Sequence, residues 1–184
     1  MDLHQMALEQ EKDSSWPPKL SMAVVERVRT ELEDVEDLPG VELLFASPDF
    51  ATDGFALVLS PVSGPLLGGQ FVFSVEVPRG FPVCSYRVTC ETPLLHPNIS
   101  WAGGICLSVL RDHWEPSTTL SAVTLGLQAL LQQPNFGDPL NHDVADYATA
   151  KGEPAGMALM TQALQGGDFL GHEVAPNPGC GPNP

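Results

Sequence analysis

The stretch from Thr92 to Thr118, TPLLHPNISWAGGICLSVLRDHWEPST, guides the interpretation of the whole chain. Its proline and glycine residues interrupt every run of helical or strand-like periodicity, although apolar residues stand between them. A loop of this length inside a compact domain usually has a functional reason. We therefore expect functional residues within it and regular structure on both sides of it.

The residues before this loop contain four short apolar segments that are typical of β-strands. They are Val41–Ala46, Phe55–Leu59, Gln70–Val77 and Tyr86–Cys90. In the third segment every second residue is apolar, which places one set on a single face: Phe71, Phe73, Val75 and Val77. Short connections between consecutive strands favour an antiparallel meander.

Helical periodicity precedes the strands. From Ser21 onward, apolar residues recur at intervals of three and four until Pro39 and Gly40 end the pattern. This apolar stripe consists of Met22, Val25, Val28, Leu32 and Val35. The other face carries charged residues, Glu31 among them, so we expect that face to be solvated.

Helical periodicity also follows the loop. Residues 120–132 form the most apolar helix, which we expect to be nearly buried and to be capped by Thr118 or Thr119. Residues 143–150 and 153–165 are two shorter helices. The predicted fold class is therefore α+β, with an N-terminal helix, a four-stranded antiparallel meander, a long loop expected to carry functional residues, a central buried helix and C-terminal helices.

The chain is strongly acidic: 23 Asp and Glu residues face 8 Lys and Arg residues among 184, so the net charge is −15. Such a surface repels phosphate backbones and anionic membranes, so we expect neither nucleic acid nor membrane as a partner. No signal peptide is visible, so the default compartment is reducing and the four cysteines are expected as free thiols. Their spacing matches no zinc pattern, and we expect no metal.

Four motifs follow one another in the loop and in the turn behind the next helix. They are His96-Pro97-Asn98, Gly104-Ile105-Cys106-Leu107, Trp114-Glu115-Pro116 and Pro134-Asn135-Phe136-Gly137-Asp138-Pro139-Leu140. Each motif alone is weak evidence. Their order and spacing together resemble the ubiquitin-conjugating enzyme family, which carries a nucleophilic cysteine eight residues after the asparagine, as here. The resemblance implies the UBC-like fold of that family.

Further segments are most similar to the branch of this family that conjugates the Nedd-type (Rub) ubiquitin-like modifier. They are Phe71-Val72-Phe73-Ser74, Cys90-Glu91-Thr92, Leu110-Arg111-Asp112, Gly126-Leu127-Gln128 and Asp138-Pro139-Leu140-Asn141. The similarity extends from about Ser21 to Leu170. It implies a UBC-like catalytic domain at 21–170. The mixed charged and proline-containing composition of residues 1–20 predicts a flexible arm, and the Pro- and Gly-rich composition of residues 171–184 predicts a flexible tail.

The resemblance implies that Cys106 carries the acyl group of the modifier as a thioester and passes it to a substrate lysine. Taken without the motifs, a cysteine between Ile and Leu is more often a core residue. Asn98 can donate to the oxyanion that forms when the amine attacks, or it can hold the loop through backbone hydrogen bonds. Asp138 can orient the lysine and favour loss of its proton, or it can serve the turn.

Three residues support this site in the resemblance: His96 orders the loop, Asn135 shapes the wall of the site, and Leu107 follows the cysteine. The ligase-docking surface corresponds to Val83, Pro116 and Ser117. The activating-enzyme surface corresponds to Arg27, Arg29, Leu3 and Met6. The arm is equally consistent with a disordered solubilising tail.

Two features depart from the family. Ser85-Tyr86 stands where the family usually has paired prolines, which affects the ligase surface rather than the chemistry. The first helix is often basic in the family but ends here in Glu31-Leu32-Glu33-Asp34-Val35-Glu36-Asp37. Either the activating enzyme docks differently, or it offers a compensating basic surface.

The resemblance predicts a transferase of an ATP-dependent conjugation pathway, monomeric, without a cofactor, in the cytoplasm, the nucleus or both. Its partners would be a thioester-linked modifier, an activating enzyme and a RING-type ligase, with a cullin substrate implied only by the branch. The alternatives are a ubiquitin-conjugating enzyme and a non-catalytic scaffold that binds modifiers. The presence of both Cys106 and Asn98 favours an enzyme over the scaffold.

Overall fold

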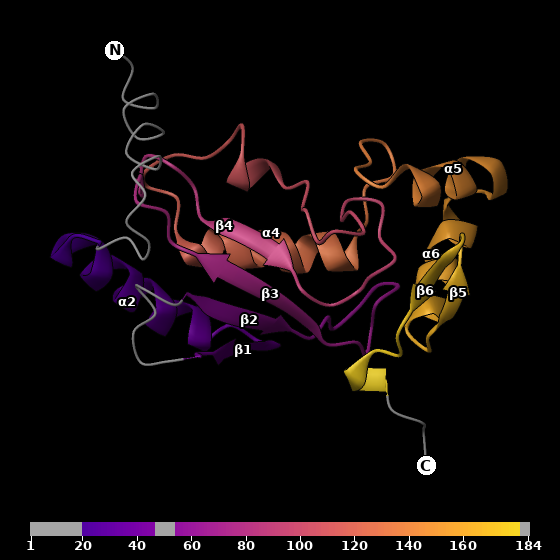
Figure 1. Ribbon diagram of the computed structural model, residues 1–184, viewed down its shortest axis with the longest axis horizontal. Coiled ribbons are helices and arrows are strands. Elements are labelled where there is room, and N and C mark those ends of the chain that lie inside the picture. The colour runs from indigo at the N-terminus through magenta and orange to yellow at the C-terminus, as the bar shows by residue number, and fades with distance from the viewer. Residues whose placement is uncertain (1–19, 47–53, 181–184) are drawn as a thin grey trace.

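The computed structural model describes residues 20–46 and 54–180. One antiparallel sheet contains four strands in sequence order, β1 (Val41–Leu44), β2 (Phe55–Leu59), β3 (Phe71–Glu76) and β4 (Arg87–Cys90). Phe73 lies opposite Leu57 on one side and opposite Cys90 on the other, which fixes the register of the three inner strands. The predicted meander is confirmed (Figure 1).

The described residues form four α-helices around the sheet. They are α2 (Met22–Glu36), α4 (Leu120–Gln132), α5 (His142–Lys151) and α6 (Glu153–Ala163). The hydroxyls of Ser21 and Thr119 cap α2 and α4, because each accepts a hydrogen bond from the backbone N–H three residues later. Figure 1 shows α4 running behind the sheet, with α2 at one end of the molecule and α5 and α6 at the other. None of the helices in the described part of the chain is long and apolar enough to cross a membrane.

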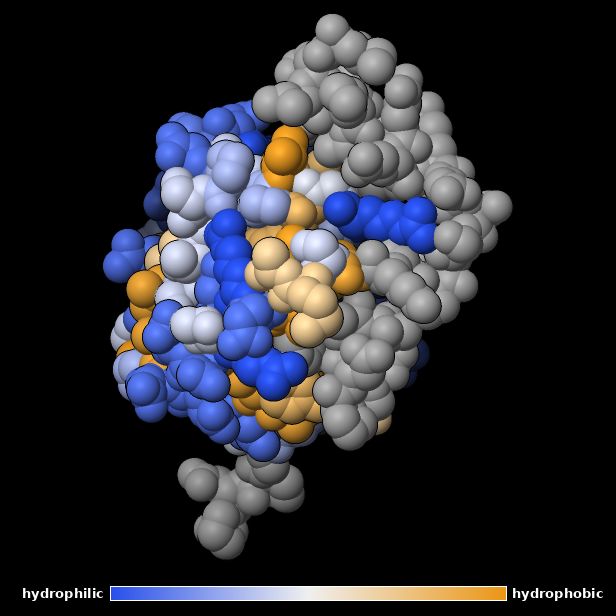
Figure 2. Space-filling view, turned by 90° about the vertical axis from the view of Figure 1, so that its left-hand side faces the viewer, coloured by the Kyte–Doolittle hydropathy of each residue, from blue (hydrophilic) through white to orange (hydrophobic). Residues whose placement is uncertain are grey.

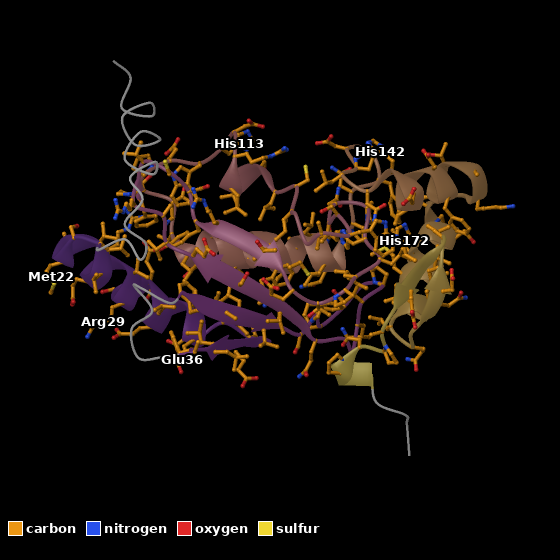
Figure 3. All side chains as sticks on the ribbon, viewed as in Figure 1. Met22, Arg29, Glu36, His113, His142 and His172 are labelled. Atoms are coloured by element: carbon orange, nitrogen blue, oxygen red, sulfur yellow. The ribbon has the colours of Figure 1, made fainter. Side chains whose placement is uncertain are left out.

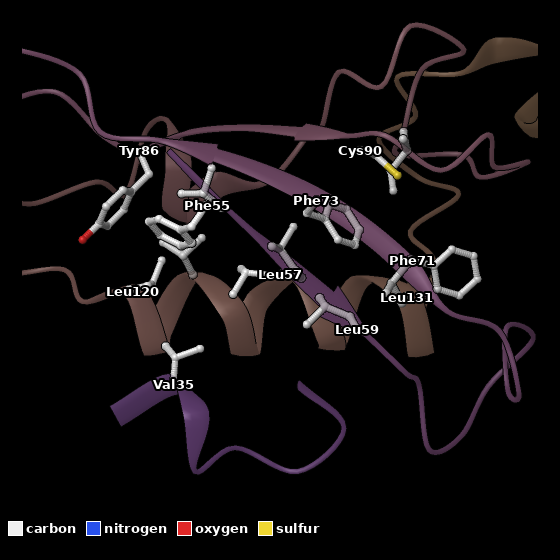
Figure 4. Packing of buried hydrophobic residues seen from close by; sticks show 14 of the residues in the cluster. Val35, Phe55, Leu57, Leu59, Phe71, Phe73, Tyr86, Cys90, Leu120 and Leu131 are labelled. Carbon is white, nitrogen blue, oxygen red and sulfur yellow. The ribbon is translucent and has the colours of Figure 1, made fainter. Parts of the chain in front are cut away.

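The core lies between the sheet and α4. One face of α4 is fully buried, at Leu120, Val123, Leu127 and Leu131. Inward-facing residues of β2 and β3 pack against it, as Figure 4 shows for Leu57, Leu59 and Phe73. Burial of each such side chain contributes roughly 1.5–3 kcal/mol, so this layer is the main source of stability for the sheet that supports the long loop.

Three expectations about burial are wrong. The central helix is not nearly buried, because Leu125 on its outer face is 50% exposed. Met22 is 80% exposed and does not belong to the buried stripe of α2. Glu31, expected on the solvated face, is only 5% exposed. The physical reason for the burial of Glu31 is a set of partners from distant segments, described below.

The C-terminal segment also differs from the expectation of a flexible tail. Strands β5 (Gly167–Phe169) and β6 (His172–Val174) form a hairpin, and a short 3-10 turn η2 (Pro178–Cys180) follows. The buried Asn177 accepts from the N–H of Gln70 at 2.7 Å and donates to its carbonyl at 2.9 Å. This pair of bonds holds the segment at the start of β3. The expected arm, residues 1–20, lies outside the described residues except for Leu20.

Candidate active site

Cys106 lies half-buried in the long loop, close to the end of β4. Its N–H donates to the carbonyl of Asn98 at 2.9 Å, which brings the asparagine and cysteine motifs side by side. Gly103 anchors the loop to β4, because its carbonyl accepts the N–H of Cys90 at 2.9 Å and a Cβ at Gly103 would collide with the Cys90 carbonyl. The thiol therefore stands on backbone held from both sides.

The Asn98 side chain forms hydrogen bonds with the turn that follows α4. Its Nδ2 donates to the carbonyls of Asn135 at 2.8 Å and Asp138 at 3.0 Å, and its Oδ1 accepts the N–H of Asn135 at 2.8 Å. The side chain is thus fully engaged, and the residue is 2% exposed. Of the two roles left open for Asn98, the geometry supports the loop-holding role.

His96 is fully buried beside this network. Its Nδ1 accepts the N–H of Asn98 at 3.0 Å, so the ring proton is on Nε2, which lies 3.1 Å from the carbonyl of Leu130. Burial lowers the pKa of His96 to about 4, although the Leu130 carbonyl opposes the shift. Because its one lone pair is occupied, His96 orders the loop, consistent with the supporting role expected for it.

Asp138 and Asn135 reach this site mainly through their backbones. Both residues are exposed, and the backbone carbonyl of Asp138 accepts a hydrogen bond from the Asn98 side chain at 3.0 Å. The Asn135 side chain accepts the N–H of Gly137 at 2.9 Å, which shapes the turn. The proposed proton-accepting role of Asp138 therefore has an accessible carboxylate to act with.

Leu107 points the other way and packs into the core. It lies over α4 at Gly126, where an added Cβ would approach Leu107 Cδ2 to 3.3 Å. A glycine in the middle of this helix thus makes room for the residue that follows the cysteine. Gly126 lies in one of the segments similar to the Nedd-type branch, but only the packing shows why a glycine stands at this position.

Arg111 contacts the cysteine, although the sequence analysis assigns it no role. Its Nη2 lies 3.1 Å from the Sγ of Cys106, and the residue is exposed. The sequence does contain a signal, because Leu110-Arg111-Asp112 is one of the segments similar to the Nedd-type branch. The position of Arg111 five residues after Cys106 does not by itself indicate a role for its side chain. Only the short 3-10 turn η1 (Ser108–Leu110) brings the guanidinium back to the thiol.

Cys90 provides a contrast to Cys106. It is buried, and its thiol donates to the carbonyl of Thr92 at 3.3 Å. Burial raises the pKa of Cys90 to about 12, so this thiol stays protonated and is a poor nucleophile. Cys106 differs from Cys90 in both respects, because it is half-buried and a guanidinium nitrogen lies 3.1 Å from its sulfur.

The two segments that carry the expected ligase-docking residues are joined at the other end of the loop by Trp114. Val83 is half-buried, while Pro116 and Ser117 are exposed. A cis peptide bond joins Phe81 to Pro82, and the indole N–H of Trp114 donates to the Pro82 carbonyl at 2.9 Å. The indole therefore connects the two segments expected to form this surface, and it packs against Phe81 and Tyr86.

Glu31 lies where α2, α4 and the segment before β4 meet. Its Oε2 accepts the Tyr86 hydroxyl and the N–H of Leu120, both at 2.7 Å. Leu120 is the first residue of α4, so the carboxylate also interacts favourably with the positive end of that helix. Burial and the Glu31 carboxylate raise the pKa of Tyr86 far above its ordinary value. The departure of the chain at Tyr86 thus has a structural role.

Arg27 completes this network. Its Nε lies 2.7 Å from Oε1 of Glu31. Its Nη1 donates to the carbonyl of Pro116 at 2.6 Å, and its Nη2 donates to the carbonyl of Thr118 at 2.9 Å. The guanidinium also covers the Phe81 ring, 4.9 Å from the centroid. We expected Arg27 at a docking surface, but its charged group is bound within the chain because these carbonyls and the carboxylate converge on it.

Arg29 lies at the surface, with a side chain that is 60% exposed and an Nε that lies 4.0 Å from Oε2 of Glu26. Figure 3 shows Met22, Arg29 and Glu36 projecting from the outer side of α2. Figure 2 looks onto this end of the molecule and shows hydrophilic surface interrupted by hydrophobic side chains. Leu3 and Met6, the other expected docking residues, lie outside the described residues.

The fold and the site together define an α+β protein with an accessible cysteine on a braced loop beside an antiparallel sheet. A sequence profile described as ubiquitin-conjugating enzyme matches residues 27–156, more than half of the chain, so the chain belongs to the ubiquitin-conjugating enzyme family. The solved structure of S. cerevisiae Ubc12 is similar, with a TM-score of 0.75 and 28% identity, covering 94% of this chain and 95% of that one.

Several curated relatives are similar in sequence. The NEDD8-conjugating enzyme UBC12 of Yarrowia lipolytica is 43% identical over 54% of this chain and 55% of its own length. The NEDD8-conjugating enzyme UBE2F of Danio rerio is 44% identical over 50% of this chain and 54% of its own length. This chain therefore spans about half the length of these curated relatives.

Proposed function

We propose that this chain is a conjugating enzyme that accepts a Nedd-type modifier as a thioester on Cys106 and transfers it to a substrate lysine. The observation that carries the proposal is the accessible Cys106, braced by Asn98 and contacted by Arg111, in a chain whose relatives are named NEDD8-conjugating enzymes. A thioester suits this task because it reacts with amines yet persists between partners.

The residues divide the work as follows. In loading, the sulfur of Cys106 attacks the thioester carbonyl on the activating enzyme, the old C–S bond breaks with its electron pair on the sulfur of the activating enzyme, and the Cys106 thiol proton passes to that sulfur or to water. In transfer, a lysine nitrogen attacks the new thioester carbon, the C–S bond breaks with its electron pair on Sγ, and Asp138 or water takes the amine proton. Asn98, with its supporting residues His96, Asn135 and Leu107, keeps the loop in place for both steps.

The partners are proposed from the same surfaces. The activating enzyme would meet the outer side of α2 at Arg29, together with Leu3 and Met6. A RING-type ligase would meet Val83, Pro116 and Ser117, with a cullin as substrate. The pathway would consume ATP at the activating enzyme, and this chain would act as a monomer in the cytoplasm, the nucleus or both.

The test offers the chain ATP, a Nedd-type modifier and its activating enzyme, followed by non-reducing electrophoresis. We expect one adduct that reductant removes, and an adduct on Cys106→Ser that reductant leaves intact, because an oxyester resists thiols. Cys84→Ser is the matched control and should load as the wild type does. A wild-type chain that never loads the Nedd-type modifier contradicts the proposal.

Ubiquitin is the second candidate modifier. The ubiquitin-conjugating enzyme E2 N of Macaca fascicularis is 35% identical over 60% of this chain and 72% of its own length. A parallel reaction with ubiquitin and its activating enzyme separates the two candidates, because loading with ubiquitin alone would reassign the modifier. Binding of a modifier without any loading would instead indicate a scaffold.

A further inference from the structure

The transfer reaction creates a negative charge that needs a hydrogen-bond donor. When an amine attacks a thioester, the π electrons of the carbonyl move onto its oxygen and form an oxyanion. Asn98 is not free to serve it, since both N–H bonds of its amide are directed at the carbonyls of Asn135 and Asp138. Turning this buried amide toward Cys106 would leave those carbonyls and the N–H of Asn135 without their partners.

Arg111 offers a donor at the reacting atom. Its Nη2 lies 3.1 Å from the Sγ of Cys106. The carbonyl oxygen of a thioester is two bonds from the sulfur, so a flexible guanidinium that reaches the sulfur also reaches the oxygen. The guanidinium is a planar cation with five N–H donors.

The Arg111 side chain is not needed to hold the turn on which it stands. The backbone N–H of Arg111 donates to the Ser108 carbonyl at 3.0 Å, and the N–H of His113 donates to the same carbonyl at 3.0 Å. The N–H of Leu110 closes the turn onto Leu107. These main-chain bonds remain when the exposed side chain is replaced, so its contact with Cys106 is open to a chemical role.

We propose that Arg111 is a catalytic residue that donates a hydrogen bond to the thioester oxyanion. This inference rests on the proposed function and deepens it. The lysine nitrogen forms a bond to the thioester carbon while Arg111 holds the oxyanion. The oxyanion then collapses, the C–S bond breaks with its electron pair on Sγ, and the amine proton passes to Asp138 or water. Arg111 keeps its own protons, so no further reactant is needed.

The test measures single-turnover discharge of the preformed thioester onto free lysine. We expect Arg111→Gln to lower the maximal discharge rate about 10-fold, which is less than the roughly 10²–10³-fold loss typical of an enclosed oxyanion donor, because the site is open to water. The lysine concentration that gives half the maximal rate should not change, because the donor acts on the transition state. Arg111→Lys should recover part of the rate, since it restores a cation.

Two controls separate chemistry from structure. Lys151→Gln removes one positive charge from the exposed end of α5 and should discharge like the wild type. Alkylation of free Cys106 by iodoacetamide should stay within about twofold of wild type in Arg111→Gln, because that reaction forms no oxyanion.

The outcomes distinguish the inference from the proposed function. If wild type and Arg111→Gln both load and discharge at the same rate, Arg111 has no oxyanion role and the proposed function stands. If alkylation falls in parallel with discharge, Arg111 acts on the sulfur and the oxyanion assignment is overturned. If the wild-type chain loads no modifier, both are overturned. Slower discharge, with intact loading, alkylation and half-saturation, supports the inference.

Discussion

The first part of the long loop, around Asn98 and Cys106, is held by neutral groups, whereas the last part, around Pro116 and Thr118, is held by charges. In the first part an amide, an uncharged imidazole and backbone groups form the bonds. In the last part the bonds come from the Arg27 guanidinium, which is paired with the Glu31 carboxylate. The same loop thus uses two kinds of support.

The difference follows from what each part does. The neutral supports next to the cysteine add no charge of their own, so the charged group in contact with its sulfur is the Arg111 guanidinium. The charged support buries a carboxylate, which is tolerated only while all its partners are present. We therefore expect removal of one charge from the last part of the loop to cause a large loss in the free energy of unfolding. Removal of one neutral group from the first part should cause a smaller loss.

The largest effect should come from Glu31→Gln. The amide cannot accept from Arg27, Tyr86 and Leu120 together, so at least one buried donor loses its partner. We expect the free energy of unfolding to fall by about 3 kcal/mol, measured by urea denaturation. Glu33→Gln, on the exposed side of the same helix, is the control and should change stability by less than about 0.5 kcal/mol. Equal effects of the two variants would refute the charged support.

Asn98→Ala tests the neutral support. It removes three hydrogen bonds but uncovers groups at a turn that water can reach, so we expect a loss of about 2–3 kcal/mol in the free energy of unfolding. The matched variant Asn135→Ala loses one exposed bond, to Gly137, and should cost about 0.5 kcal/mol. If Asn98→Ala lowers the free energy of unfolding no more than Asn135→Ala does, the Asn98 amide does not hold the loop.

Acid should weaken the neutral support through His96. Its pKa is about 4 in the folded chain, below its ordinary 6.5, so the unfolded chain binds the proton first as pH falls. The contribution of neutral His96 to the free energy of unfolding is fully present above about pH 6.5 and is lost toward pH 4. Between about pH 8 and about pH 5 the free energy of unfolding should therefore fall by about 2 kcal/mol. Urea denaturation at both pH values measures it. His96→Gln should remove this part of the pH dependence, and an unchanged slope in that variant would contradict the assignment.

The smallest effect is expected where the loop meets the C-terminal hairpin. Trp101 stacks on His172 and donates its indole N–H to Asp143 at 3.1 Å, but this cluster is partly exposed. Asp143→Asn should lower the free energy of unfolding by about 0.5 kcal/mol, measured by thermal and urea denaturation. Asp146→Asn on the same helix should have no effect. A loss above about 2 kcal/mol for Asp143→Asn would make this cluster a third main support.

Much of the fold could be predicted from the sequence because its signals are local. The predicted strand Phe55–Leu59 and the helix at 120–132 have the observed bounds, since periodicity and flanking Pro, Gly and Thr residues act over a few positions. The order of the motifs likewise located the cysteine loop. The missed features involve contacts between distant segments. The sequence pattern places Glu31 on a solvated face, but in the fold it is buried against Tyr86, 55 residues away, and Leu120, 89 residues away.

The sequence by itself determined the elements, their order and the family of the chain, because short-range spacing specifies helices, strands and motifs. Only the tertiary structure decided which polar side chains form hydrogen bonds within the chain and which lie at the candidate active site. Arg27 was expected at a surface but is bound within the chain, while Arg111 had no expected role and lies against Cys106. The physical reason is that a charge finds its partner through space, where the fold, and not the sequence spacing, sets the distance.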